Sequence, residues 1–90
     1  MPRQTTTPLE ARFGAQLGRE LQSARKRHNM SGSDLAKASG VGLDTIRRIE
    51  SGRIASPGIL VLTRLMRALD EPLGQIAARA LAVSEEQEKR

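Results

Sequence analysis

A single glycine, Gly40, joins two short helical patterns, and this arrangement constrains the fold more than any other feature of the chain. The first pattern contains Ala36, and the second contains Ile46 and Ile49. A tight turn between two helices needs a residue that tolerates positive φ, and a close crossing needs a small contact residue such as Ala36. The run over residues 35–50 therefore predicts a helix-turn-helix, the motif that places its second helix in the major groove of DNA.

Helix start signals also precede this run. Thr7 and Glu10 have the spacing of a capping box, and Pro8 suits a first helical position, so a helix is predicted from there to about His28. Its apolar face repeats at helical spacing, at Phe13, Leu17, Leu21 and Ala24. Ser31 is expected to cap a second, short helix that Gly40 ends, with Asp34 three residues after the cap. The third helix is predicted over residues 43–51.

Two further helices are predicted after Gly52. Ser56 is expected to cap the fourth, with Pro57 at its first position. Its buried stripe is expected to consist of Ile59, Leu62, Leu65, Met66 and Leu69. The fifth is expected from Leu73 to residue 83, with Ser84 onward as a frayed charged tail. Strand-like alternation is missing, so the expected fold is all-α, a compact five-helix bundle. Its domain is expected over residues 8–83, between a flexible N-terminal arm, 1–7, and a charged tail, 84–90.

Composition narrows the function classes. The net charge is +5 with a pI near 11, and residues 1–30 carry six Lys and Arg against two acids, which favours a polyanion partner. Phe13 is the one aromatic residue, so duplex DNA is favoured over single strands that stack on aromatic rings. The chain has no cysteine and one histidine, His28, and we expect no enzyme activity, metal or cofactor. We expect no membrane span and a cytoplasmic location.

The motif resembles the Cro/CI-type (Xre-type) helix-turn-helix family of phage and bacterial regulators. The resemblance covers about residues 14–77. Its most specific part is a Leu-Ala pair followed at the right spacing by Ile-x-x-Ile-Glu-x-Gly, here residues 35–36 and 46–52. The resemblance implies a lambda-repressor-like five-helix domain that binds operator DNA as a dimer, with the helix over 43–51 as the recognition helix. It also implies a bacterial or phage protein, associated with the nucleoid when bound.

Helical winding decides which residues of the recognition helix face DNA. With Ile46 and Ile49 turned inward, Asp44 and Arg48 point away from the core, and Arg47 lies on a flank. In the family that this chain resembles, base contacts come from this tip and outer face, here Gly42, Leu43, Asp44, Arg47 and Arg48. Arg48 is the first candidate for direct readout, because an arginine forks onto the O6 and N7 of guanine.

Asp44 and Leu43 each have two interpretations. Asp44 either accepts from cytosine N4 or pairs with Arg48 four residues later, and we favour the second role, in which it holds Arg48 in position. Leu43 either touches a thymine methyl or covers part of the protein or a partner. Arg47 is expected to meet phosphate more readily than a base.

A second set of residues is expected to contact the DNA backbone. Its members supply cations, hydroxyls or bare amides around the motif: Arg25, Ser31, Gly32, Ser33, Thr45, Ser51 and Arg53. Gly32 stands where the family often has a glutamine that holds a phosphate, so phosphate contacts are expected to be few. The resemblance also implies that Arg25 bridges to Glu50, and we expect loss of Arg25 to weaken both folding and DNA binding.

The second half of the chain is expected to carry a partner surface. Apolar residues beyond the core stripes predict a homodimer interface at Leu60, Val61, Ala80, Leu81 and Val83. The sequence thus predicts a sequence-specific double-stranded DNA-binding regulator, a repressor that binds a palindromic operator as a homodimer. The alternative is an antitoxin-type or accessory DNA-binding protein whose fifth helix binds a protein partner.

Overall fold

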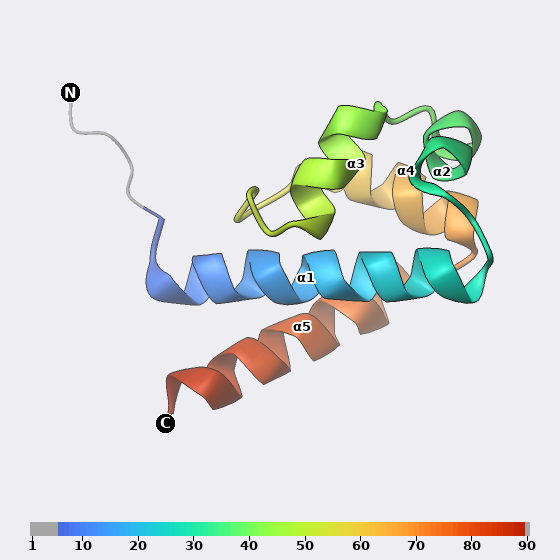
Figure 1. The fold of residues 1–90 in the computed structure, drawn as a ribbon. Coiled ribbons are helices and arrows are strands. Elements are labelled where there is room, and N and C mark those ends of the chain that lie inside the picture. Colours follow the sequence, from blue (N-terminus) through green and yellow to red (C-terminus); the bar gives the residue numbers. More distant parts are fainter. Residues whose placement is uncertain (1–5, 90) are drawn as a thin grey trace.

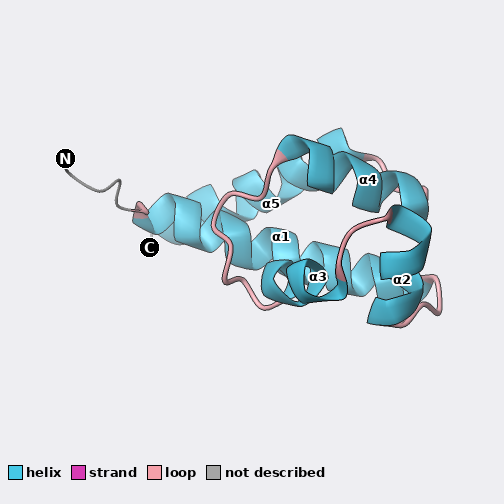
Figure 2. Ribbon diagram, turned by 90° about the horizontal axis from the view of Figure 1, so that it is seen from above, coloured by secondary structure: helices cyan, strands magenta, loops and turns pink. Residues whose placement is uncertain are grey.

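A computed structural model describes residues 6–89, and these residues form helices joined by short loops (Figures 1 and 2). Residues 1–5, which make up most of the expected N-terminal arm, and Arg90 lie outside the described residues. The helices are α1 (Pro8–Arg27), α2 (Gly32–Ser39), α3 (Leu43–Glu50), α4 (Ile59–Leu69) and α5 (Leu73–Glu88). The all-α, five-helix fold expected from the sequence is confirmed.

Two capping boxes begin the first two helices, as the sequence predicts. Thr7 Oγ1 accepts from the Glu10 backbone N–H at 3.1 Å, and the Glu10 carboxylate accepts from the Thr7 N–H at 3.0 Å. Ser31 and Asp34 repeat the arrangement at the start of α2, at 3.0 and 2.9 Å. Each box satisfies backbone donors that have no partner within the helix, so both starts are fixed locally.

Helix α1 lies through the middle of the molecule (Figure 1). It packs against α5 on one side and α3 on the other, while α2 packs against both α3 and α4. The buried apolar side chains come from all five helices and the turn before α3: Leu17, Leu21, Ala24, Leu35, Val41, Ile46, Ile49, Leu62, Leu65, Met66, Leu69, Ile76 and Ala80. None of the helices among residues 6–89 is long and apolar enough to cross a membrane.

The start of α4 differs from the prediction. The helix begins at Ile59 with Gly58 as its N-cap, so Ser56 is not the cap and Pro57 lies in the preceding loop. Ile59, expected in the buried stripe, is 72% exposed. Side chains on a helix point back toward its N-terminus, so a residue in the first turn projects past the end of the helix rather than onto the neighbour that covers the next turn.

Helix α5 continues five residues past the predicted end, to Glu88. Ser84, expected to begin a frayed tail, is fully buried, and its hydroxyl donates to the Ala80 carbonyl at 2.7 Å. Ion pairs also join α5 to α1, between Arg79 and Glu20 at 2.9 Å and between Arg12 and Glu88 at 3.4 Å. Residues 84–88 are mostly polar, and for this reason the sequence predicts a tail. They are helical in the structure because α1 gives this part of α5 a surface to pack against.

Candidate nucleic-acid interface

The turn between α2 and α3 has the geometry that a helix-turn-helix needs. Gly40 ends α2 in the left-handed conformation, with φ 75°, and donates its N–H to the Ala36 carbonyl at 3.0 Å. Val41 then turns its side chain into the core, and its N–H donates to the Ser39 hydroxyl at 3.1 Å. A residue with a β-carbon is strained at such a φ, so the glycine sets the angle at which α3 leaves α2.

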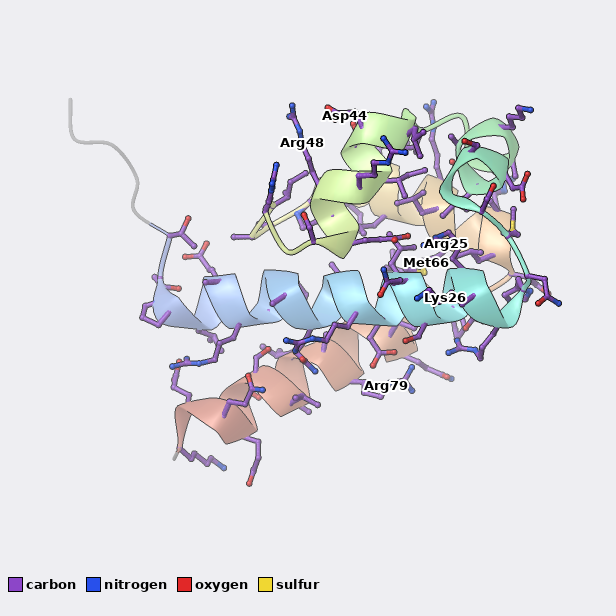
Figure 3. All side chains as sticks on the ribbon, viewed as in Figure 1. Arg25, Lys26, Asp44, Arg48, Met66 and Arg79 are labelled. Carbon is purple, nitrogen blue, oxygen red and sulfur yellow. The ribbon has the colours of Figure 1, made fainter. Side chains whose placement is uncertain are left out.

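Helix α3 has one buried and one exposed face, as helical winding predicts. Ile46 and Ile49 are almost completely buried. Asp44, Arg47 and Arg48 are exposed, and Figure 3 shows Asp44 and Arg48 on the side of α3 that faces away from α1. The expected outer face of α3 is therefore exposed to solvent.

The expected pairing of Asp44 with Arg48 is present. Asp44 Oδ2 lies 3.1 Å from Arg48 Nη2, with the two side chains 79% and 59% exposed. The pair lines a shallow pocket of ≈ 270 Å³ with Arg47, Ser51 and Arg53. The pocket thus gathers three cations and one carboxylate, a mostly positive surface suited to a polyanion.

At the N-terminal tip of α3, one candidate residue is exposed and two are half-buried. Gly42 is exposed and forms the N-cap of α3 without a side-chain cap. Leu43 is half-buried, and a β-carbon placed on Gly32 would lie 2.9 Å from its Cδ1. Leu43 therefore covers the first residue of α2, which favours the covering role among its two interpretations. Thr45 is also half-buried.

The start of α2 is partly occupied by the protein's own groups. The Ser31 N–H and hydroxyl are both engaged with Asp34, which leaves the amides of Gly32 and Ser33 outside the capping box. The hydrogen bonds from the Ser31 backbone and hydroxyl lower the pKa of the Asp34 carboxyl below its usual 3.8, so it is ionised at neutral pH. A phosphate at this helix start would meet that negative charge, which limits the contact expected from Ser31.

Arg25 and Glu50 form the bridge that the resemblance implies. Arg25 Nε and Nη2 donate to the two Glu50 oxygens at 2.7 and 2.9 Å, and both side chains are largely buried, at 14% and 9% exposed. The hydrogen bond to Glu50 raises the pKa of Arg25. Arg25 Nη1 also donates to the Met30 carbonyl at 2.9 Å. This third contact, which ties α1 to the loop before α2, has no signal in the sequence because it uses a backbone oxygen.

At the C-terminal end of α3, two candidates for backbone contacts lie beside the outer face. Ser51 and Arg53 are exposed and line the pocket with Arg48. The Ser51 hydroxyl donates to the Arg48 carbonyl at 3.1 Å, an orientation that stabilises the end of the helix. Arg25, by contrast, is held inside the fold, so the exposed candidates lie around α3 and at the start of α2 rather than on α1.

The sequence profile of the helix-turn-helix family matches residues 21–76. The chain belongs to the Cro/CI-type helix-turn-helix family. The matched region covers α2, α3 and α4, the last third of α1, and the start of α5. Members of this family are DNA-binding regulatory domains, so the chain is a DNA-binding transcription regulator. No curated protein matches the chain.

The expected dimer residues of this helix-turn-helix protein do not form one exposed set. Leu60 and Leu81 are exposed, at 61% and 40%, and Val83 is half-buried. Ala80 is fully buried and cannot contact a second copy, because it lies in the row of α5 that also buries Ile76 and Ser84. Val61, expected off the core, packs against it beside Leu62 and Leu65.

Proposed function

We propose that this regulator is a repressor that recognises a specific, two-fold-symmetric operator in duplex DNA as a homodimer. Helix α3 enters the major groove and presents Asp44, Arg47 and Arg48 to base edges. The observation that carries the proposal is the exposure of these three side chains on the face of α3 opposite its buried isoleucines. An α-helix fits the major groove, where each base pair has a distinct donor and acceptor pattern.

The contacts to the phosphates are proposed to be few. Arg53, Ser51 and Thr45 flank the outer face of α3, and the amides of Gly32 and Ser33 add donors at the start of α2. Arg25 acts indirectly, by holding the end of α3 against α1. Since each neutralised phosphate releases counterions, binding is expected to weaken as the salt concentration rises.

Dimer formation is proposed because one recognition helix covers only one half-site, and two-fold dimers read half-sites about 34 Å apart. The apolar side chains that support it are Leu60 with its neighbour Ile59, and Leu81 with Val83. Repression is the simplest outcome of such binding, because occupancy of an operator that overlaps a promoter blocks polymerase without further contacts.

Selection of bound sites from random duplex DNA tests this function. The expected result is one enriched half-site, repeated in inverted orientation at a spacing near one helical turn. Titrating the enriched site and a scrambled site at two salt concentrations should show specific binding that weakens with salt. Enrichment of no motif, or equal affinity for both sequences, would contradict the proposal.

A pair of matched variants distinguishes DNA binding by the recognition helix from DNA binding through the net positive charge of the chain. Arg48→Ala and Lys89→Ala each remove one exposed cation, but Lys89 follows α5 on the opposite side of α1 from α3 (Figure 1). Arg48→Ala is expected to lose affinity for the selected site, whereas Lys89→Ala retains it. Equal losses in the two variants would show that the chain binds DNA through net charge alone.

A further inference from the structure

Asp44 is an acid in a place where DNA binding alone would favour a neutral or basic residue. Its side chain is 79% exposed on the outer face of α3, beside Arg47, Arg48 and Arg53. Close to phosphates, a carboxylate is repelled, so its position lowers the affinity for any DNA sequence that offers it no donor. Such a penalty against most sequences is a source of specificity.

The ion pair between Asp44 and Arg48 leaves hydrogen-bonding groups of both side chains available. It joins one carboxylate oxygen, Oδ2, to one guanidinium nitrogen, Nη2, at 3.1 Å. A guanidinium carries five N–H donors in a rigid fork, so the outer edge of Arg48 keeps enough donors for a guanine. Asp44 Oδ1 likewise keeps its acceptor capacity. An exposed pair of this kind contributes little to folding, so it can adjust on contact with DNA.

The spacing of the two residues fits neighbouring base pairs. Four residues of an α-helix advance about 6 Å along its axis, and successive base pairs lie about 3.4 Å apart. Arg48 and Asp44 therefore reach base pairs that are one or two steps from each other. The structure thus places a fork of donors and an acceptor oxygen side by side on the outer face of α3.

Base chemistry decides what the carboxylate accepts. Guanine and thymine have no donor on their major-groove edges, and their acceptors repel a carboxylate, while cytosine carries the N4 amino donor. Adenine also has an amino group, but its N7 acceptor lies beside it. Among the four bases, cytosine is therefore the best partner for Asp44.

We propose that Asp44 is a specificity-determining residue that accepts from cytosine N4 in the half-site, while its partner Arg48 donates to a guanine one or two base pairs away. This inference rests on the proposed function and goes beyond it, because it assigns two bases of the operator to two named side chains. Asp44 holds Arg48 in position in the free protein and reads a base of its own in the complex.

Site selection with Asp44→Asn tests the inference. An asparagine has a donor and an acceptor and pairs with adenine N6 and N7, so the selected base should change from cytosine to adenine while the guanine stays. Against the wild-type site, a single change of that cytosine should weaken wild-type binding by about 5-fold to 150-fold. When the cytosine is changed to adenine, binding of Asp44→Asn should instead become stronger.

A control variant and two further measurements distinguish base readout by Asp44 from a general effect of charge or folding. Glu85→Gln removes one exposed acid from α5 and is expected to select the wild-type motif unchanged. Thermal unfolding of Asp44→Asn should match that of the wild type, since the side chain is exposed. A gain of affinity for scrambled DNA is expected for Asp44→Asn, because the repulsion of phosphates is removed.

Two results would overturn the inference and leave the proposed function intact. If Asp44→Asn selects the wild-type motif, the carboxylate reads no base. If the guanine preference disappears while the neighbouring base is unchanged, Asp44 acts only by holding Arg48. Failure of the wild-type chain to select any motif would instead overturn the proposed function itself.

Discussion

Gly18 in α1 lies directly against the backbone of Ile49 in α3. A β-carbon on Gly18 would overlap the Ile49 carbonyl oxygen and would lie 2.9 Å from the Glu50 carbonyl oxygen. A β-carbon on Gly14, one turn earlier, would lie 2.6 Å from the Ile54 carbonyl oxygen in the loop after α3. The end of α3 is thus fixed to α1 by a backbone contact that only glycine permits.

Gly18→Ala is expected to destabilise the fold by about 1–3 kcal/mol or more, because the methyl group meets the rigid backbone of Ile49 and Glu50. Gly74→Ala is the control, since Gly74 is also helical but has open space around its would-be β-carbon. That change should be neutral or stabilise α5 by up to about 1 kcal/mol. Urea unfolding measures both, and equal stability of the two variants would show that α1 and α3 are not in close contact.

Arg25→Ala is expected to destabilise the chain by about 3 kcal/mol, because it leaves the Glu50 carboxylate inside the fold without its partner. Affinity for the selected DNA site should fall as well, since α3 loses an anchor at its end. Arg27→Ala, two residues later, breaks only an exposed contact to Glu71 and should cost less than about 1 kcal/mol. A small effect of Arg25→Ala on unfolding would refute the structural role of the bridge.

Acid is expected to destabilise the helix starts. The pKa of Asp34 is lowered in the fold by its hydrogen bonds to Ser31, so its contribution to stability is full above its usual 3.8 and is lost as the pH falls through the lowered folded value. The pKa of Glu10 is lowered in the same way by Thr7. Asp34→Asn should therefore lose less stability than the wild type between about pH 5 and pH 2. The midpoints of urea unfolding, measured for both proteins across this pH range, test the prediction. If the midpoints of the two proteins fall in parallel as the pH is lowered, Asp34 does not have the capping role.

Leu60→Lys is expected to weaken the proposed homodimer by more than about ten-fold in Kd, because it places a charge where an apolar side chain would be buried. Leu81→Lys tests the α5 part of the surface in the same way. Ser23→Lys, exposed on α1 rather than on α4 or α5, is the control and should leave the dimer intact. Light scattering over a concentration series gives the readout, and a wild-type chain that is monomeric at micromolar concentration would contradict the dimer and favour a different protein partner.

Local signals predicted much of the fold. The capping boxes at Thr7 and Ser31, the left-handed Gly40, and the buried stripe of Ile46 and Ile49 are all present. Each of these features depends on residues within about one turn of a helix, so the sequence alone is enough to predict it. The pairing of Asp44 with Arg48 is local in the same sense, because helical spacing alone brings the two together.

The errors arise where a neighbouring element decides the outcome. Ile59 fits the periodicity of α4 but is exposed, because its first turn projects past the packed part of the helix. Ser84 and Ala80 are buried because α5 packs against α1, with ion pairs between the two helices on either side of this segment. A glycine inside a long helix normally lowers the stability of the helix. The presence of Gly18 within α1 is therefore the one feature of the sequence that indicates a close contact there.

By itself, the sequence determined where four of the five helices begin, the turn that makes the motif, and the face of α3 that meets solvent. Only the tertiary structure decided how α3 is held. The Gly18 contact, the third hydrogen bond of Arg25 to the Met30 carbonyl and the burial of Ser84 join segments that are distant in sequence or use backbone atoms. Such contacts leave no periodic pattern, because their partners are brought together by packing rather than by the spacing of residues along one helix.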